Sequence, residues 1–137
     1  MTKTVHGRCF CKGVTFEIDL PIKWCVSCHC ESCRRQCSAP MVTYVGVNDR
    51  QWRWTGEEAQ TYHSSPGVER TFCGACGTPL TFRSERMTGL MHFYLNALED
   101  PERFEPELHT SYEEKLCWLN VVDELPKKNG PEVVFPD

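Results

Sequence analysis

The chain has 137 residues, 10 of them cysteine, and its 15 Lys and Arg against 19 Asp and Glu give a formal net charge of −4. This length suits one domain, residues 1–137, and the acidic balance argues against nucleic acid as the main partner, because that binding needs clustered Lys and Arg. No apolar run approaches the roughly 18 residues of a membrane span, and the first residues lack the apolar core of a secretory signal. Because cysteine-rich chains without such a signal favour a reducing compartment, we expect a cytoplasmic protein.

The first half of the chain has mostly the residue patterns of β-strands. Residues 14–20 alternate apolar and polar side chains, and residues 41–47 form a β-branched and aromatic run. Trp52 and Trp54 would share one face of another strand. The one helix predicted in this half starts near Ser27 or His29 and contains residues 31–36.

The second half predicts a zinc-ribbon hairpin followed by shorter elements. Residues 68–72 form a strand that enters the loop C-G-A-C-G, and Leu80 begins the return strand. Residues 91–98 predict a further strand. Asp100 and the proline after it favour the start of a short helix, and residues 117–122 are a last apolar segment.

Three short motifs contain most of the cysteines. They are Cys9-x-Cys11, Cys28-x-Cys30-x2-Cys33 and Cys73-x2-Cys76. Two sulfurs from one such tight loop can reach a single zinc at about 2.3 Å, whereas disulfide geometry is hard to satisfy within the loop. Four cysteines make a closed structural site, and three leave a position open, as in catalytic sites. We therefore expect two Zn²⁺ per chain, a structural one on Cys9, Cys11, Cys73 and Cys76 and a catalytic one on Cys28, Cys30 and Cys33.

These motifs and their surroundings resemble the glutathione-dependent formaldehyde-activating enzyme (GFA) family, which includes centromere protein V. The matching stretches are GRCFCKGV (7–14), CHCESCRR (28–35) and SPGVERTFCGACGTPL (65–80), with LEDP (98–101) and WL (118–119). The resemblance implies a mainly β, single-domain, zinc-ribbon-containing β-tent fold with one or two short helices. It also implies the same division of the cysteines into a structural and a catalytic zinc site. The chain departs from the namesake enzymes in being short.

In the family's namesake reaction, glutathione adds through its thiol to formaldehyde, and the enzyme is classed as a carbon–sulfur lyase of the S-(hydroxymethyl)glutathione synthase type. The resemblance therefore implies that a thiol substrate, glutathione, binds as a zinc thiolate beside Cys28, Cys30 and Cys33. Arg34 and Arg35 would pair with glutathione carboxylates, and a solvated helix face is the alternative for them. The alternative function is a non-enzymatic zinc module that binds a protein or nucleic acid.

The remaining cysteines each have a structural and a chemical interpretation. Cys25 forms a formal chelating pair with Cys28, and Cys37 lies on the helical face of the other ligands; we expect both to be packed thiols. Cys117 invites comparison with the late nucleophile of B-type methionine sulfoxide reductases. Its neighbours are apolar and no cation adjoins it, so we expect Cys117 to pack in the core.

Four histidines are candidates for a fourth metal ligand or a base. His29 lies between two proposed ligands, and we expect it to point away from the metal because its neighbours point toward it. His63, His92 and His109 are further candidates, with a surface or core position as the default for each.

Overall fold

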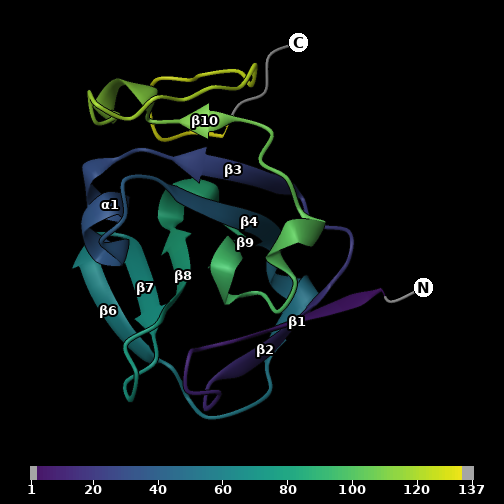
Figure 1. The fold of residues 1–137 in the computed structure, drawn as a ribbon. Helices are drawn as coiled ribbons and strands as arrows, with labels where there is room; N and C mark the ends of the chain where they lie inside the picture. Colours follow the sequence, from purple (N-terminus) through teal and green to yellow (C-terminus); the bar gives the residue numbers. More distant parts are fainter. Residues whose placement is uncertain (1–2, 134–137) are drawn as a thin grey trace.

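The computed structural model describes residues 3–133, which form two β-sheets and one α-helix (Figure 1). The larger sheet has seven strands in the order β10, β3, β4, β9, β8, β7, β6, and the smaller has three in the order β1, β2, β5. Neighbouring strands are antiparallel except β10, which lies parallel to β3. The strands are β1 (Thr4–Arg8), β2 (Thr15–Asp19), β3 (Trp24–Cys28), β4 (Val42–Asn48), β5 (Trp52–Trp54), β6 (Gln60–Ser65), β7 (Val68–Phe72), β8 (Pro79–Ser84), β9 (Leu90–Tyr94) and β10 (His109–Thr110). The expected mainly β, single-domain fold is confirmed.

The helix α1 (Glu31–Cys37) lies between the β3–β4 part of the large sheet and the outer strands β6 and β7 (Figure 1). It begins later than the sequence predicted, because Ser27 belongs to β3 and Cys30 is the N-cap residue. The backbone N–H of Cys33 donates to the Cys30 sulfur at 3.3 Å. The helix ends at Ser38, whose φ of 50° is left-handed. Thus the cysteine motif itself starts the helix.

The core between the two sheets is built on aromatic rings. Phe16 of β2 stacks on Phe93 of β9, with ring centroids 4.4 Å apart. Trp52 and Trp54 pack edge-on against Phe93 and against each other, so the strand predicted to carry both rings is confirmed. Gly7 of β1 leaves room for the Phe16 ring, which a Cβ at that position would overlap. Complete burial of a ring such as Phe16 stabilises the fold by roughly 1.5–3 kcal/mol.

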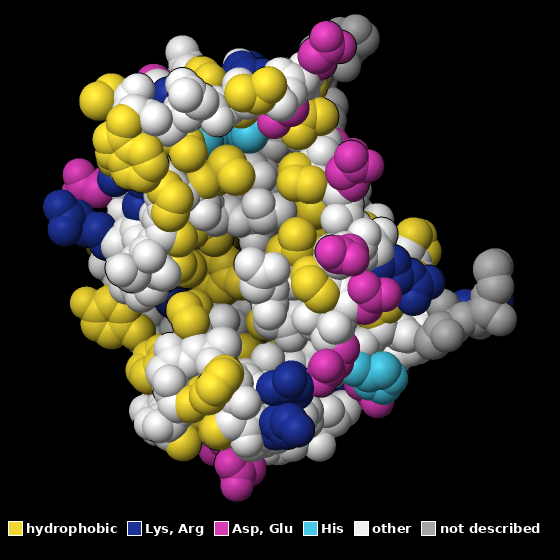
Figure 2. Space-filling view, in the orientation of Figure 1, with side chains coloured by type: hydrophobic (Ala, Val, Ile, Leu, Met, Phe, Trp, Pro, Cys, Tyr) yellow, Lys and Arg dark blue, Asp and Glu magenta, His cyan; other side chains and the backbone are white. Residues whose placement is uncertain are grey.

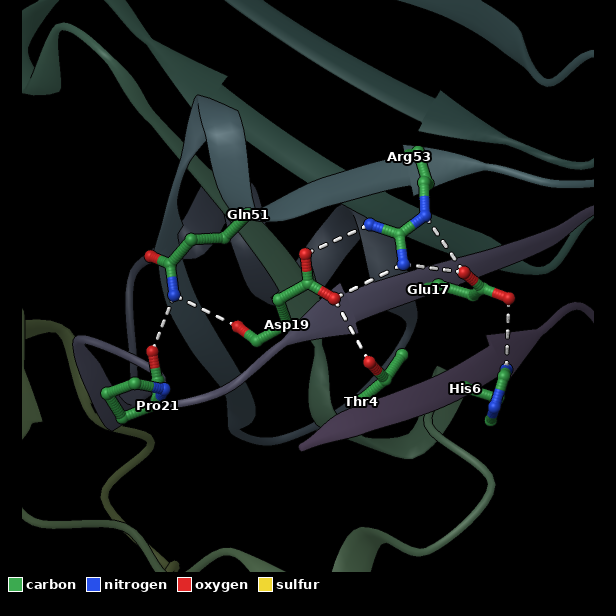
Figure 3. A network of polar contacts seen from close by, with 7 residues as sticks. All are labelled: Thr4, His6, Glu17, Asp19, Pro21, Gln51 and Arg53. Carbon is green, nitrogen blue, oxygen red and sulfur yellow. Dashed lines mark hydrogen bonds and ion pairs between the residues drawn. The ribbon is translucent and has the colours of Figure 1, made fainter. Parts of the chain in front are cut away.

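Charged side chains connect the strands of the small sheet on its outer face (Figure 3). Arg53 of β5 pairs with Glu17 at 2.7 Å and with Asp19 at 3.0 Å, both on β2. Asp19 also accepts a hydrogen bond from the Thr4 hydroxyl of β1. The Gln51 amide donates to the backbone carbonyls of Asp19, the last residue of β2, and of Pro21. These contacts hold in register the sheet whose first hairpin carries Cys9 and Cys11, although exposed ion pairs each contribute only about 0–1 kcal/mol.

The second half of the chain differs from prediction at three places. The strand expected over 91–98 ends at Tyr94 and continues as a one-turn 3₁₀ helix, Leu95–Ala97. The helix expected after Asp100 is a single 3₁₀ turn, Pro101–Arg103, and the Asp100 side chain makes no cap hydrogen bond. The remaining 3₁₀ turns of the described chain are Asp49–Gln51, Glu85–Met87 and Tyr112–Glu114.

The apolar segment 117–122 is the third difference. It forms turns and irregular chain at the surface, where 66% of Trp118 is exposed. The predicted hairpin around the C-x2-C loop is confirmed, since β7 and β8 pair antiparallel on either side of it.

The charged side chains on the face shown in Figure 2 are of mixed sign. Among residues 3–133 there is no helix with the length and apolar character needed to cross a bilayer. Figure 2 shows Lys and Arg side chains interspersed with Asp and Glu on the face it presents. On that face the charges do not gather into a basic stripe of the kind that nucleic acid binding requires.

The core also contains a histidine whose burial makes stability depend on pH. His92 of β9 packs against Trp24 and Tyr44, and burial lowers the pKa of His92 to about 4. The unfolded chain has the ordinary value of about 6.5, so it binds this proton more readily than the folded protein does. The stability that the neutral ring maintains above about pH 6.5 is therefore lost as the pH falls toward 4.

We expect His92→Phe to remove this pH dependence. The free energy of unfolding of the unmodified protein should fall by about 2 kcal/mol from about pH 8 to about pH 5 through His92, and the variant should lack this fall. Denaturant unfolding at the two pH values measures the difference. His63→Phe, at an exposed position on β6, is the control and should follow the unmodified protein. Equal pH dependence in both variants would contradict the assignment.

Candidate metal centres and adjoining cavity

Four cysteines from two distant parts of the chain meet where the two sheets join. Cys9 and Cys11 lie in the turn between β1 and β2, and Cys73 and Cys76 lie in the loop between β7 and β8. Their four sulfurs all lie within 4.8 Å of one another, and none is in a disulfide. The structure therefore brings together the four residues for which the sequence predicted a structural zinc.

Hydrogen bonds to sulfur organise this group. The Val14 N–H donates to the Cys9 sulfur at 3.3 Å. The Thr78 hydroxyl lies 3.2 Å from the Cys76 sulfur and lowers the pKa of Cys76 to about 5. The same hydroxyl accepts the Phe10 N–H at 2.9 Å, which connects the two cysteine loops directly. Such donors favour the thiolate forms that a metal requires.

A second group of three cysteines forms at the junction of β3 and α1. Cys28 is the last residue of β3, Cys30 caps α1, and Cys33 lies in the first turn of the helix. Their sulfurs also lie within 4.8 Å of one another. Cys28 and Cys33 are buried, whereas Cys30 is half-buried and is the one nearest to solvent.

The protons of these three thiols are coupled in the absence of a cation. Hydrogen bonds from Cys30 and Cys33 lower the pKa of Cys28, and the hydrogen bond between Cys33 and Cys28, together with burial and the charge on Cys28, raises the pKa of Cys33. Three thiolates in this space therefore need a compensating positive charge. A metal ion held by the three sulfurs would supply this charge, because a cysteine binds a metal as the thiolate and loses its proton.

Both groups fit zinc. The donors are sulfur atoms, which zinc binds in tetrahedral sites, and backbone N–H groups point at the sulfurs. The first group offers four ligands and is complete. The second offers three, so one of the four positions around a zinc held there would remain free.

A cavity of about 460 Å³ adjoins the three-cysteine group. Of the three sulfur-bearing residues, Cys30 alone lines it. The other walls come from α1, the β6–β7 turn, the sheet and the chain after β10. They include Ser32, Arg70, Phe82, Arg86, Ser111 and Glu114. A small molecule in this cavity would therefore meet the group at its exposed corner.

Arg70 of β7 is a buried member of this cavity wall that the sequence reasoning missed. Only 5% of the residue is exposed. Its guanidinium donates to Tyr94 Oη at 2.9 Å and to Ser64 Oγ at 3.1 Å, and it lies 3.9 and 4.0 Å from the Cys33 sulfur. The ring of Phe82 lies 4.9 Å away. The available signal was an arginine within the strand that leads into the C-x2-C motif.

Arg34 and Arg35 of α1 do not line the cavity at Cys30. Arg34 donates to the backbone carbonyls of His29 and Glu114, at 3.0 and 3.3 Å, and so ties the helix to the chain after β10. Arg35 is exposed and pairs with Glu31 one turn earlier. Both line an open hollow distinct from the cavity at Cys30. Their role in binding glutathione carboxylates stays a prediction.

The histidines stand apart from both sulfur groups. The His29 ring lies 2.8 Å from the His109 ring, nitrogen to nitrogen, and His109 lies 2.8 Å from a carboxylate oxygen of Asp123. Hydrogen bonding from His109 lowers the pKa of Asp123 to about 2, and burial lowers the pKa of His29 to about 4. The expectation that His29 points away from the metal is confirmed. Within residues 3–133 neither sulfur group includes His63 or His92.

The three other cysteines differ in their surroundings. Cys25 is buried in β3, which raises the pKa of its thiol to about 12, so the expected inert thiol is confirmed. Cys37 is half-buried and packs beside the three-cysteine group, as expected. The expectation of a packed Cys117 is wrong, because this residue is exposed in the surface turns that also expose Trp118.

Comparison with known proteins identifies the family to which the sequence is similar. Residues 4–114 match the model of the family described as glutathione-dependent formaldehyde-activating enzyme. A protein of Schizosaccharomyces pombe named as an uncharacterized lyase is 32% identical over 92 residues, which cover 67% of this chain and 65% of that relative. A Halomonas elongata protein with the name "Putative glutathione-dependent formaldehyde-activating enzyme" is 26% identical over 127 residues, covering 85% of this chain and 80% of that protein.

A solved structure has the same fold. The crystal structure of a Rhodobacter sphaeroides protein superposes with a TM-score of 0.60 at 18% identity, over 89% of this chain and 98% of that one. At this identity the likeness concerns the fold alone. The family match extends over most of the chain and includes both cysteine groups. The chain therefore belongs to the family of glutathione-dependent formaldehyde-activating enzymes.

Proposed function

We propose that this protein is a zinc-dependent carbon–sulfur lyase. It binds a thiol, glutathione, beside Cys28, Cys30 and Cys33 and adds it to, or eliminates it from, an aldehyde such as formaldehyde. One observation carries the proposal: the sulfurs of Cys28, Cys30 and Cys33 lie within 4.8 Å of one another, and Cys30, the half-buried residue of the three, lines a cavity. When bound there, zinc would favour the thiolate form of a substrate thiol, which is the nucleophilic form.

The reaction itself makes one bond. The substrate sulfur forms a bond to the aldehyde carbon, the π electrons of the carbonyl move to oxygen, and the proton lost from the thiol ends on that oxygen. The chain contributes position: Cys30 fixes where the sulfur enters, and Phe82 and Met87 give the cavity apolar walls. Holding two reactants together in this way accelerates a bimolecular step.

Glutathione suits the cavity in size and in charge. Ligand pockets usually measure about 300–1,000 Å³, and this one measures about 460 Å³. Its walls carry both signs of charge, since Arg86, Glu85 and Glu114 all line it. A zwitterionic peptide thiol has carboxylates and an ammonium group to match them. All ten cysteines are free, which accords with a reducing, cytoplasmic compartment.

Cobalt substitution of the 137-residue protein tests the proposal. We expect glutathione to change the visible absorption of the cobalt form, because a fourth sulfur enters the coordination of the second ion. S-Methylglutathione, which lacks the thiol but keeps both carboxylates and the ammonium, is the control and should leave the spectrum unchanged. The rate at which formaldehyde is lost to glutathione should then rise with added protein above the rate with glutathione alone. No spectral response to any low-molecular-weight thiol would contradict the proposal and favour a non-enzymatic zinc module.

A further inference from the structure

Arg70 places a buried positive charge beside the three-cysteine group. Its contacts fix the guanidinium from several sides: Ser64 accepts from Nε, Tyr94 accepts from Nη1, and the Phe82 ring lies along it. The remaining neighbour is the Cys33 sulfur, 3.9 Å from Nη1 and 4.0 Å from Nη2. Both terminal nitrogens of the guanidinium are therefore within hydrogen-bond reach of one sulfur.

The other partners of this guanidinium are neutral. Among residues 3–133 no carboxylate forms an ion pair with Arg70. By contrast, Arg8, Arg53 and Arg83 lie nearer to solvent and pair with carboxylates. A buried charge without a counter-charge is costly to the fold. The atoms placed to carry the missing negative charge are the sulfurs of the three-cysteine group.

We propose that Arg70 is a positioning residue that supplies the counter-charge of this group and favours an anionic sulfur at its free position. Three thiolates around a divalent zinc leave one net negative charge, and the guanidinium balances it. A further thiolate then enters a neutral surrounding instead of an anionic one. Arg70 also lines the cavity at Cys30, so its charge faces the route of entry. The part that concerns the incoming sulfur rests on the proposed function, whereas the part that concerns the metal does not.

Metal affinity tests the first part. Arg70→Met removes the charge and keeps the length of the side chain, Arg70→Gln removes the charge and keeps a donor, and Arg70→Lys keeps the charge. Competition with a chromogenic chelator should show the second zinc bound at least about ten-fold more weakly in the Met and Gln variants. The Lys variant should stay within about three-fold of the unmodified protein.

The first zinc and the far-ultraviolet circular dichroism report folding in each variant. Arg83→Met, on the neighbouring strand, is the matched control because Arg83 pairs with Asp49 and not with sulfur; it should keep both zinc affinities. Unchanged affinity for the second zinc in the folded Met or Gln variant would overturn the proposal. So would a Lys variant as weak as the Met variant, because shape and not charge would then be responsible.

Thiol binding tests the second part. In the cobalt form, Arg70→Met should bind both glutathione and 2-mercaptoethanol about ten-fold more weakly than the unmodified protein does. The small thiol has no carboxylate, so its loss of affinity reports the sulfur charge alone. A loss confined to glutathione would overturn this part. If the unmodified protein binds no thiol, the proposed function fails, and the zinc affinities still decide the role of Arg70.

Discussion

Replacing Cys73 by alanine is expected to unfold the domain. Its sulfur lies with those of Cys9 and Cys11, which come from the other sheet, so a metal in this group holds the two sheets together. Structural zinc sites contribute about 10–16 kcal/mol, whereas whole domains are stable by only about 5–15 kcal/mol. The loss of one of four ligands should therefore leave little or no folded protein at room temperature.

Thermal unfolding followed by circular dichroism measures this effect, and metal analysis of the same sample gives the zinc content. Cys117→Ala is the control, since Cys117 is exposed and outside both sulfur groups; its transition should match that of the unmodified protein. A Cys73→Ala protein with a cooperative transition at an unchanged temperature would show that this group does not hold a structural metal.

Replacing Cys30 should abolish activity and leave the domain folded, in contrast to replacing Cys73. Cys30 is the residue of the three-cysteine group that lines the cavity, and it does not belong to the four-cysteine group. We expect Cys30→Ala to contain one zinc instead of two and to have no thiol-dependent turnover of the aldehyde above background. Metal content and aldehyde consumption, measured on the same preparation, test both halves of this prediction.

A second variant separates the roles of the Cys30 sulfur. Because this sulfur also accepts the N–H of Cys33 at the start of α1, Cys30→Ala should lower the free energy of unfolding by about 1 kcal/mol through the lost cap. Cys30→Ser keeps a capping acceptor, so it should recover that stability and remain inactive. Full turnover in either variant would remove Cys30 from the site.

The sequence predicted both sulfur groups because short chelating loops are local features. It failed where the outcome depends on distant parts of the chain. The strand β3 is buried along its whole length and shows no alternation, so its Ser27 was assigned to the start of the helix instead. The apolar run around Cys117 has a core-like composition, but nothing folds over it.

Arg70 illustrates the same limit within the site. An arginine in a strand is usually a solvated residue, and its place three residues before Cys73 does not by itself indicate burial. Its burial arises because Cys33 and Tyr94, far apart in sequence, meet it on one side. Such a contact follows from the pairing of β7 with β8 and of β8 with β9, which the cysteine spacing does not specify.

The chain after β10 lines the cavity and carries none of the cysteines of the two sulfur groups. The family match ends at residue 114, yet Pro131 and Glu132 line the cavity at Cys30. The segment is held in place by Asp123, which pairs with His109, and by the backbone bond from Ser111 to Gly130. Substitutions in this tail can therefore reshape the cavity wall without moving a sulfur. If the proposed function holds, substitutions at Pro131 and Glu132 would change which thiols fit the cavity and leave both cysteine groups intact.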